Sequence, residues 1–200
     1  MLGYGPPASH ARIGAILIHG RGASAEDILG LSQEFSHRDI AYLAPRAAGN
    51  TWYPYSFLMP MEQNEPALSS ALRSIETLVS SLRAQNVPPE RVAVMGFSQG
   101  ACLSLEFAAR HAQRYAAVAA FSGGLIGPPG TPRDYQGSLD GTPVFLGCSD
   151  VDPHIPVDRV HESAVVFTRM GAVVDRRVYP RMGHTINQEE IEAVDALLRP

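Results

Sequence analysis

The chain has 200 residues, of which 45% are hydrophobic and 18% are charged, and its formal net charge at neutral pH is −4. This length suits one well-buried domain over residues 1–200 and is short for two. The weak negative charge shows no basic stripe of the kind that attracts nucleic acid or anionic lipid, so we expect neither partner.

The first twenty residues, MLGYGPPASHARIGAILIHG, lack the charged region and long apolar run of a secretory signal. Elsewhere in the chain no apolar run approaches the length that crosses a bilayer. The sequence therefore predicts a soluble, cytoplasmic protein without membrane insertion. Two cysteines, Cys102 and Cys148, are too few for a disulfide framework or a structural zinc site.

Short apolar runs alternate along the chain with patterns of helical period. Runs that are apolar on both faces are typical of strands in the buried middle of a parallel sheet. We interpret most of these runs as strands: IGAILI (13–18), IAYLA (40–44), VAVM (92–95), AAVAAF (116–121), PVFLG (143–147) and VVDRRVY (173–179).

Helical patterns lie between these runs. In residues 65–85 apolar side chains recur at steps of three and four, with Asn64 as an N-cap and Pro88 as part of the stop. In the last helix Asn187 is placed to cap, ahead of acidic residues that the helix dipole favours in the first turn. This last helix spans 187–198, and the two remaining predicted helices span 99–111 and 157–170.

Strand and helix alternate throughout, which predicts an α/β fold with a mostly parallel sheet and helices on both faces. The stretch 123–142 is rich in Gly and Pro, and we interpret it as a long surface connection between two strands. No insertion is long enough for a large lid domain.

One short motif carries the chemistry. Gly96-Phe97-Ser98-Gln99-Gly100 matches G-x-S-x-G, in which a serine lies at a sharp turn from a strand to a helix and small neighbours relieve the crowding. The pattern alone is weakly specific. The apolar run before it and the helical pattern after it supply the required context, and a plain glycine-rich turn is the competing interpretation.

A serine hydroxyl needs a base to take its proton and an acid to orient that base. In this fold the chain order is serine, acid, histidine, each in a loop beyond the carboxyl end of a strand. Of the seven histidines, His184 fits best, because it follows the strand 173–179 and precedes the last helix. His19 precedes Ser98 in the chain, so its position does not fit this order.

The acid is expected in the loop after the strand 143–147, which contains Asp150 and Asp152. Either carboxylate could reach the histidine, so the position of the loop does not choose between Asp150 and Asp152. The stretch SDVDPHIP also permits a metal site in which Asp150, Asp152 and His154 are alternating ligands, but no second cluster completes a coordination sphere. We therefore expect no metal.

Four stretches occur in order from near the start to near the end of the chain: LIHGRG, GFSQGA, SDVDPHIP and MGHT. In combination they resemble the phospholipase/carboxylesterase branch of the α/β-hydrolases, which includes the acyl-protein thioesterases. The resemblance covers nearly the whole chain and implies a single-domain α/β-hydrolase. It implies Ser98 as nucleophile, His184 as base and Asp152, rather than Asp150, as the acid.

By the same resemblance, the backbone N–H groups of Arg21 and Gln99 form the oxyanion hole. Such donors stabilise charge that develops only in the transition state. Relatives such as the acyl-protein thioesterases carry an apolar residue in place of Arg21. The arginine is expected to put a cation near the mouth of the site, which weakens any transfer of substrate from those relatives.

The segment NTWYPYSFLMPM, residues 50–61, gathers aromatic and apolar side chains without a clean period. It is a candidate wall for an apolar acyl pocket, and a loop that tucks its side chains into the core is the alternative. In similar family members a tryptophan of the corresponding loop lies near the active site. The candidate substrate-binding residues are Trp52, Tyr53, Phe57 and Leu58.

The sequence therefore predicts a serine carboxylesterase that hydrolyses small soluble esters of short to medium chain length through an acyl-enzyme, without a cofactor. An acyl-thioesterase or lysophospholipase with the same three residues is the first alternative. A non-catalytic small-molecule receptor on the same fold is the alternative of another class. Related enzymes are often dimers, which suggests a homodimer, although the sequence offers no self-complementary patch.

Overall fold

A computed structural model describes residues 1–199 of the chain. Over this range the chain forms one seven-stranded sheet in the order β1-β3-β2-β4-β5-β6-β7. β1 is antiparallel to β3, and all other neighbouring strands are parallel. The strands are β1 (Leu2–Tyr4), β2 (Ile13–Ile18), β3 (Ile40–Ala44), β4 (Val92–Phe97), β5 (Ala117–Phe121), β6 (Pro143–Ser149) and β7 (Val173–Tyr179).

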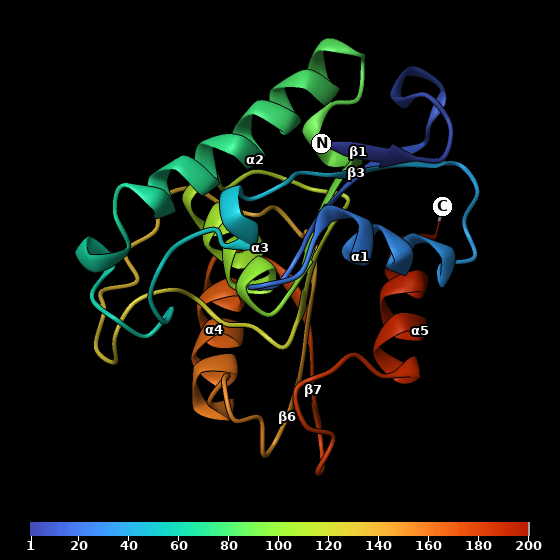
Figure 1. Cartoon of the computed structure of the whole chain (residues 1–200). Coiled ribbons are helices and arrows are strands. Elements are labelled where there is room, and N and C mark those ends of the chain that lie inside the picture. Colours follow the sequence, from blue (N-terminus) through green and yellow to red (C-terminus); the bar gives the residue numbers. More distant parts are fainter. Residues whose placement is uncertain (200) are drawn as a thin grey trace.

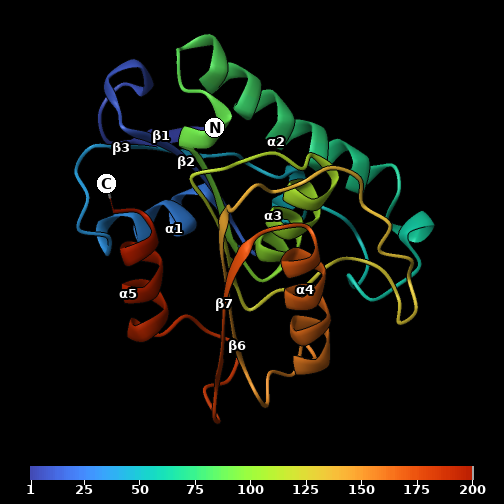
Figure 2. The same cartoon turned by 180° about the vertical axis from the view of Figure 1, so that it is seen from behind.

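Five α-helices of the described range cover the two faces of the sheet (Figures 1 and 2). Helices α2, α3 and α4 pack on one face, and α1 and α5 pack on the other. This α/β-hydrolase architecture is the predicted one. The helices are α1 (Ala25–Gly30), α2 (Ala67–Ala84), α3 (Gln99–Arg110), α4 (Val157–Arg169) and α5 (Gln188–Leu197).

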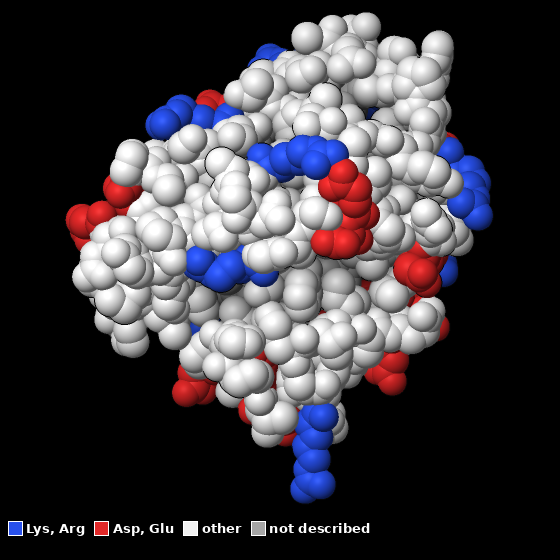
Figure 3. Space-filling view, in the orientation of Figure 1, with Lys and Arg blue, Asp and Glu red and all other residues white. Residues whose placement is uncertain are grey.

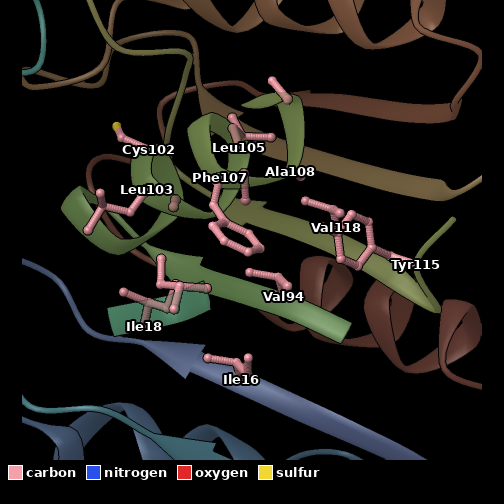
Figure 4. Close-up of a cluster of buried hydrophobic side chains, with 14 of the residues drawn as sticks. Ile16, Ile18, Val94, Cys102, Leu103, Leu105, Phe107, Ala108, Tyr115 and Val118 are labelled. Carbon is pink, nitrogen blue, oxygen red and sulfur yellow. The ribbon is translucent and has the colours of Figure 1, made fainter. Parts of the chain in front are cut away.

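The centre of the core lies between α3 and the middle strands. Every residue of β2 and β5 is buried, as is every residue of α3 before Arg110. Figure 4 shows side chains of α3, including Phe107, over Val94 of β4 and Val118 of β5. This apolar contact fixes the first turn of α3 at the end of β4, where Ser98 lies.

The predicted strands and long helices are confirmed, with boundaries that shift by a few residues. The N-cap predicted at Asn64 is wrong, because α2 starts at Ala67 after Pro66. A proline suits the start of a helix, where its missing N–H is not needed. The Asn64 side chain instead accepts a hydrogen bond from Tyr55 N at 2.9 Å. It thereby holds residues 50–61, which we call the aromatic segment. The short elements β1 and α1 were not predicted.

Asn187 caps α5 as predicted. Its side chain accepts a hydrogen bond from Glu190 N, and the Glu190 side chain accepts one from Asn187 N, which completes a capping box. The cap residue lies three positions after His184 and so fixes the loop that carries this histidine.

The predicted surface connection 123–142 is only partly on the surface. Leu125 and Ile126 are buried, and buried backbone groups need hydrogen-bond partners. Ile126 N donates to Glu106 Oε2 at 3.1 Å, and Arg159 Nη1 donates to Leu125 O at 2.7 Å. Charged side chains of α3 and α4 therefore bind this segment to the core.

Charges of both signs are interspersed on the face of the molecule shown in Figure 3. Within residues 1–199, no helix is long and apolar enough to cross a membrane. In the same range, no group of three His, Cys, Asp or Glu side chains is arranged to hold a metal ion.

Candidate active site

Ser98 lies at the turn between β4 and α3, with φ 56° and ψ −117°, a sparsely populated conformation for a residue other than glycine. The turn requires the two glycines of the motif. A Cβ on Gly100 would lie 2.0 Å from Ile18 O, and one on Gly96 would lie 2.5 Å from the backbone of Gly100. The Ser98 side chain makes no capping bond to α3, so its hydroxyl is free to face other residues.

Three loops at the carboxyl ends of parallel strands bring Ser98, His184 and Asp152 together. Ser98 Oγ lies 2.9 Å from His184 Nε2, and His184 Nδ1 lies 2.7 Å from Asp152 Oδ2. The side chain of Asp152 has 0% of its surface exposed and that of His184 has 18%. The result is a continuous hydrogen-bonded chain that runs from a buried carboxylate to an accessible hydroxyl.

The carboxylate of Asp152 is held by its own loop as well as by His184. Its Oδ1 accepts hydrogen bonds from His154 N at 2.8 Å and Ile155 N at 3.0 Å. Burial by itself would raise the pKa of Asp152, but the hydrogen bonds from His184 and from the two backbone N–H groups outweigh it and hold the pKa below its usual value. The charged form is therefore favoured, which suits a group that stabilises an imidazolium.

Asp150, which the sequence left as an alternative acid, lies elsewhere. It is exposed, and its Oδ1 accepts a hydrogen bond from Arg181 N at 2.7 Å. The two aspartates thus have separate partners: Asp152 faces His184, and Asp150 supports the turn that follows β7. The structure brings Asp152 and not Asp150 to the imidazole.

His19 and the two cysteines have other surroundings. His19 is buried, and its Nε2 accepts a hydrogen bond from Ala47 N at 3.2 Å. Burial raises the pKa of the Cys102 thiol and of the Cys148 thiol to about 12. A thiol with such a pKa is protonated at neutral pH and is a poor nucleophile, so neither cysteine competes with Ser98.

The backbone N–H groups of Arg21 and Gln99 lie beside Ser98. A Cβ built on Gly20 would lie 3.4 Å from Ser98 Cβ, which places the Gly20–Arg21 peptide against the serine. Gln99 is the first residue of α3, and the first N–H groups of a helix have no partner within it. In the described part of the chain neither N–H has a backbone acceptor. These two N–H groups therefore remain the candidates that the sequence analysis named.

Arg21 lines the pocket beside Ser98, and its guanidinium binds the aromatic segment. Its Nη1 donates to Pro54 O at 2.8 Å, and its Nη2 donates to Tyr53 O at 2.9 Å and to Tyr55 O at 2.7 Å. The Gln99 side chain also donates to Tyr53 O, at 2.9 Å. Both candidate oxyanion residues therefore hold this segment through their side chains.

A pocket of about 560 Å³ opens beside Ser98. Of the four predicted substrate-binding residues, Tyr53 and Phe57 line it and Trp52 and Leu58 do not. The Trp52 side chain is buried in the core, where its Nε1 donates to His19 O at 2.9 Å, and Leu58 packs against the core. The lining residues are Gly20, Arg21, Ala23, Tyr53, Pro54, Tyr55, Ser56, Phe57, Phe97, Ser98, Gln99, Cys102, His154, Ile155 and His184.

The sequence analysis did not assign Phe97 or His154 to the wall of the active site, where both line the pocket. The ring of Phe97 lies 4.9 Å from that of His184, and the ring of His154 meets it edge-on at 4.8 Å between centroids. Both missed residues adjoin motif residues, since Phe97 precedes Ser98 and His154 follows Asp152 by two positions. Proximity to the motifs is the signal that could have identified them.

Comparison with known proteins identifies relatives over nearly the whole chain. The phospholipase/carboxylesterase family model matches residues 6–199. A crystal structure of a phospholipase/carboxylesterase from Dyadobacter fermentans is 42% identical, has a TM-score of 0.96, and aligns with 99% of this chain and 95% of its own. A probable carboxylesterase from Arabidopsis thaliana, SOBER1-like, is 24% identical over 96% of this chain and 79% of its own length. Acyl-protein thioesterase 1 of Gibberella zeae is 32% identical over 56% of this chain and 49% of its own length.

Proposed function

Since this chain belongs to the phospholipase/carboxylesterase family of hydrolases, we propose that it is a serine carboxylesterase that cleaves carboxylic esters of short to medium chain length through an acyl-enzyme on Ser98. The observation that carries the proposal is the hydrogen-bonded chain from Ser98 Oγ through His184 to Asp152, with distances of 2.9 and 2.7 Å. Its hydroxyl end opens into the pocket.

Ser98, His184 and Asp152 each have a role in the proposed reaction. His184 Nε2 takes the proton of Ser98 Oγ as the oxygen attacks the ester carbonyl. Asp152, which remains charged, stabilises the imidazolium and fixes the ring through Nδ1. The N–H groups of Arg21 and Gln99 bind the oxyanion, and each such donor contributes about 10²- to 10³-fold in rate.

The remaining steps reuse the same groups. The imidazolium gives its proton to the leaving alcohol as the carbon–oxygen bond to that alcohol breaks, which leaves the acyl-enzyme. A water molecule then gives a proton to His184 and attacks the acyl carbon. The imidazolium passes this proton to Ser98 Oγ as the bond between Oγ and the acyl carbon breaks, which releases the carboxylic acid and restores Ser98. No cofactor takes part in the proposed reaction.

The pocket supports a small or medium acyl group as the substrate. Tyr53, Phe57 and Ile155 supply apolar surface along its wall, and such surface favours an apolar acyl chain over a charged one. Within residues 1–199 no element forms a separate lid over the pocket, which supports action on soluble esters.

Thioesters are the second candidate substrates, because one of the relatives is an acyl-protein thioesterase and the same acyl chemistry serves oxygen esters and thioesters. Lysophospholipids share that chemistry. A non-catalytic receptor on the same fold would use the pocket without needing Ser98, His184 and Asp152 in one hydrogen-bonded chain, and this geometry therefore supports the enzyme over the receptor.

The test compares initial hydrolysis rates on p-nitrophenyl esters of increasing acyl length, an acyl thioester and a lysophospholipid. We expect turnover that peaks at short to medium acyl esters, and Ser98→Ala to lose at least about 10³-fold. Ser122→Ala is a matched control, because Ser122 follows β5 as Ser98 follows β4 and also has a positive φ, 53°. Wild-type and Ser98→Ala proteins with equal rates on every substrate would contradict the proposal.

A further inference from the structure

The two edges of the sheet differ in length and in surface. β1 spans three residues at one edge, and β7 spans seven at the other. Figure 2 shows β7 between α4 and α5. Exposed apolar side chains lie on both faces along this edge: Val173 is 67% exposed on the α5 side, and on the α4 side Val178 is 36% and Val165 of helix α4 is 66% exposed. A long edge strand beside exposed valines is a template for pairing with another strand.

The backbone of β7 offers hydrogen-bonding groups at regular intervals. Val173 N donates to Thr142 O, and Tyr179 O accepts from Asp150 N, so at these residues the polar groups point toward β6. Because the direction alternates along a strand, the N–H and C=O groups of Val174, Arg176 and Val178 point away from the sheet. Among residues 1–199 no strand pairs with this side of β7.

The side chains of β7 divide between the two faces. Asp175 is in register with Phe145, which belongs to the core on the α5 side. Asp175 and Arg177 therefore face the α5 side, where they form an ion pair along the strand at 2.9 Å. Val174, Arg176 and Val178 face the α4 side.

From this pattern we infer that β7 is a homodimer interface, in which two copies of the chain pair their β7 strands antiparallel about a two-fold axis at Arg176. In this register Val174 lies opposite Val178 of the second copy, and Asp175 lies opposite its Arg177. The outward backbone groups of Val174, Arg176 and Val178 then meet their counterparts, which gives about six main-chain hydrogen bonds. The two sheets become one continuous sheet.

Charge complementarity favours a second copy over another partner. Charges on an edge strand ordinarily oppose pairing, but here the two-fold axis places Asp175 across from Arg177 twice. These residues form non-hydrogen-bonded pairs, in which opposed side chains come closest. Together with the ion pair within each strand they make a square of four charges of alternating sign. The sequence analysis found no self-complementary patch, because the complementarity of VVDRRVY depends on its position as an edge strand. The segment is complementary to itself only when it runs antiparallel in this register.

On the α4 side of the paired strands, one contact favours association of the two copies and one opposes it. Val174 and the second copy's Val178 meet beside the groove that α4 forms with β7, and they cover apolar surface there. Arg176 meets its own copy on the axis, and like charges directly opposite each other oppose association. The inferred register therefore predicts that the removal of this charge tightens the dimer.

Sedimentation equilibrium of the whole chain tests the inference. The wild-type protein is expected to associate to twice its mass of 21.5 kDa as its concentration rises. Asp175→Arg and Arg177→Asp are each expected to weaken the dimer by at least about tenfold, and the double variant is expected to restore it. Arg176→Thr is expected to tighten the dimer by up to about fivefold. Far-UV circular dichroism checks that each variant is folded.

A wild-type protein that remains monomeric would overturn the inference. So would a dimer that survives both single reversals, or one that the double variant does not restore. Hydrogen exchange of the wild-type protein gives a reading that needs no variant: the amides of Val174, Arg176 and Val178 are expected to exchange more slowly at high than at low protein concentration. Equal exchange at all concentrations would also exclude the interface.

Discussion

Two clusters of buried charge, one around Arg159 and one around His184 and Asp152, differ in the groups on which their hydrogen bonds end. Around Arg159, each bond ends on protein: the guanidinium donates to Leu125 O at 2.7 Å and Gly127 O at 2.6 Å, and pairs with Glu162 at 2.9 Å. Around His184, the bonds run from Asp152 to Ser98 Oγ, which opens into the pocket. Both clusters contain buried charge, so burial alone does not distinguish a reactive site from a structural network. The distinguishing feature is a hydroxyl, Ser98 Oγ, that opens into the pocket.

The largest expected effect is on the reactive cluster. Asp152→Asn keeps the shape of the side chain but removes the charge that stabilises the imidazolium, so we expect kcat/KM to fall about 10⁴-fold. Asp150→Asn is the matched control two residues away and is expected to leave kcat/KM nearly unchanged, because Asp150 bonds Arg181 N. Equal losses in the two variants would show that the acid has been assigned wrongly.

The structural cluster should respond in stability. Arg159→Met removes the donor of Gly127 O, leaves Leu125 O only the long bond from Arg133 Nη2 at 3.5 Å, and breaks an ion pair. We therefore expect the free energy of unfolding to fall by about 3–5 kcal/mol. Urea unfolding measures it, and Arg83→Met at an exposed position of α2 is the control, within about 0.5 kcal/mol of wild type. An Arg159→Met variant of unchanged stability but abolished activity would contradict the distinction between the clusters.

Glu190 is a buried carboxyl that belongs to neither cluster. In the described part of the chain, its Oε1 has no hydrogen-bond partner. Burial raises its pKa from 4.5 to about 7, although its hydrogen bond from Asn187 N opposes the rise. The folded state therefore binds this proton more tightly, and stability falls as the pH rises from 4.5 to about 7.

Glu190→Gln keeps the capping box and removes this charge. We expect the free energy of unfolding above about pH 8 to rise by on the order of 3 kcal/mol, and the two proteins to converge below about pH 4. Urea unfolding across this range measures the difference. A gain of the same size at both ends would mean that a change in packing, rather than the titration, causes it.

The smallest expected effect is at Arg21, whose side chain donates to the carbonyls of residues 53–55 and whose backbone N–H is proposed to bind the oxyanion. Arg21→Met keeps the N–H and removes the bonds to the carbonyls of residues 53–55, so we expect KM to rise roughly tenfold with little change in kcat. Arg21→Lys keeps the charge but not the planar fork. If lysine restores the wild-type KM, charge rather than loop positioning is the property that matters.

The sequence predicted the sheet well, because the central strands are apolar on both faces and the helices between them keep a clear period. It also predicted the residues that the structure brings to the end of the sheet, since Ser98 and His184 follow strands and the glycines around Ser98 are required by close contacts with Ile18 O. Between Asp150 and Asp152, only the family resemblance favoured one residue.

The sequence could not predict contacts that depend on side-chain direction. Trp52 was expected near the substrate, but its N–H group reaches the buried carbonyl of His19. The segment 123–142 was interpreted as surface because Gly and Pro favour loops, whereas Glu106 and Arg159 satisfy its buried backbone. Nothing in the spacing of these residues along the chain indicates that α3 and α4 supply those partners.

The most direct test of the central claim is covalent labelling by a fluorophosphonate, followed by intact mass measurement and peptide mapping. The account predicts one adduct, on Ser98, that is absent in Ser98→Ala and forms much more slowly in Asp152→Asn. A folded wild-type protein that gains no adduct, or that carries it on a residue other than Ser98, would contradict the claim that the bonds from Asp152 through His184 activate this serine.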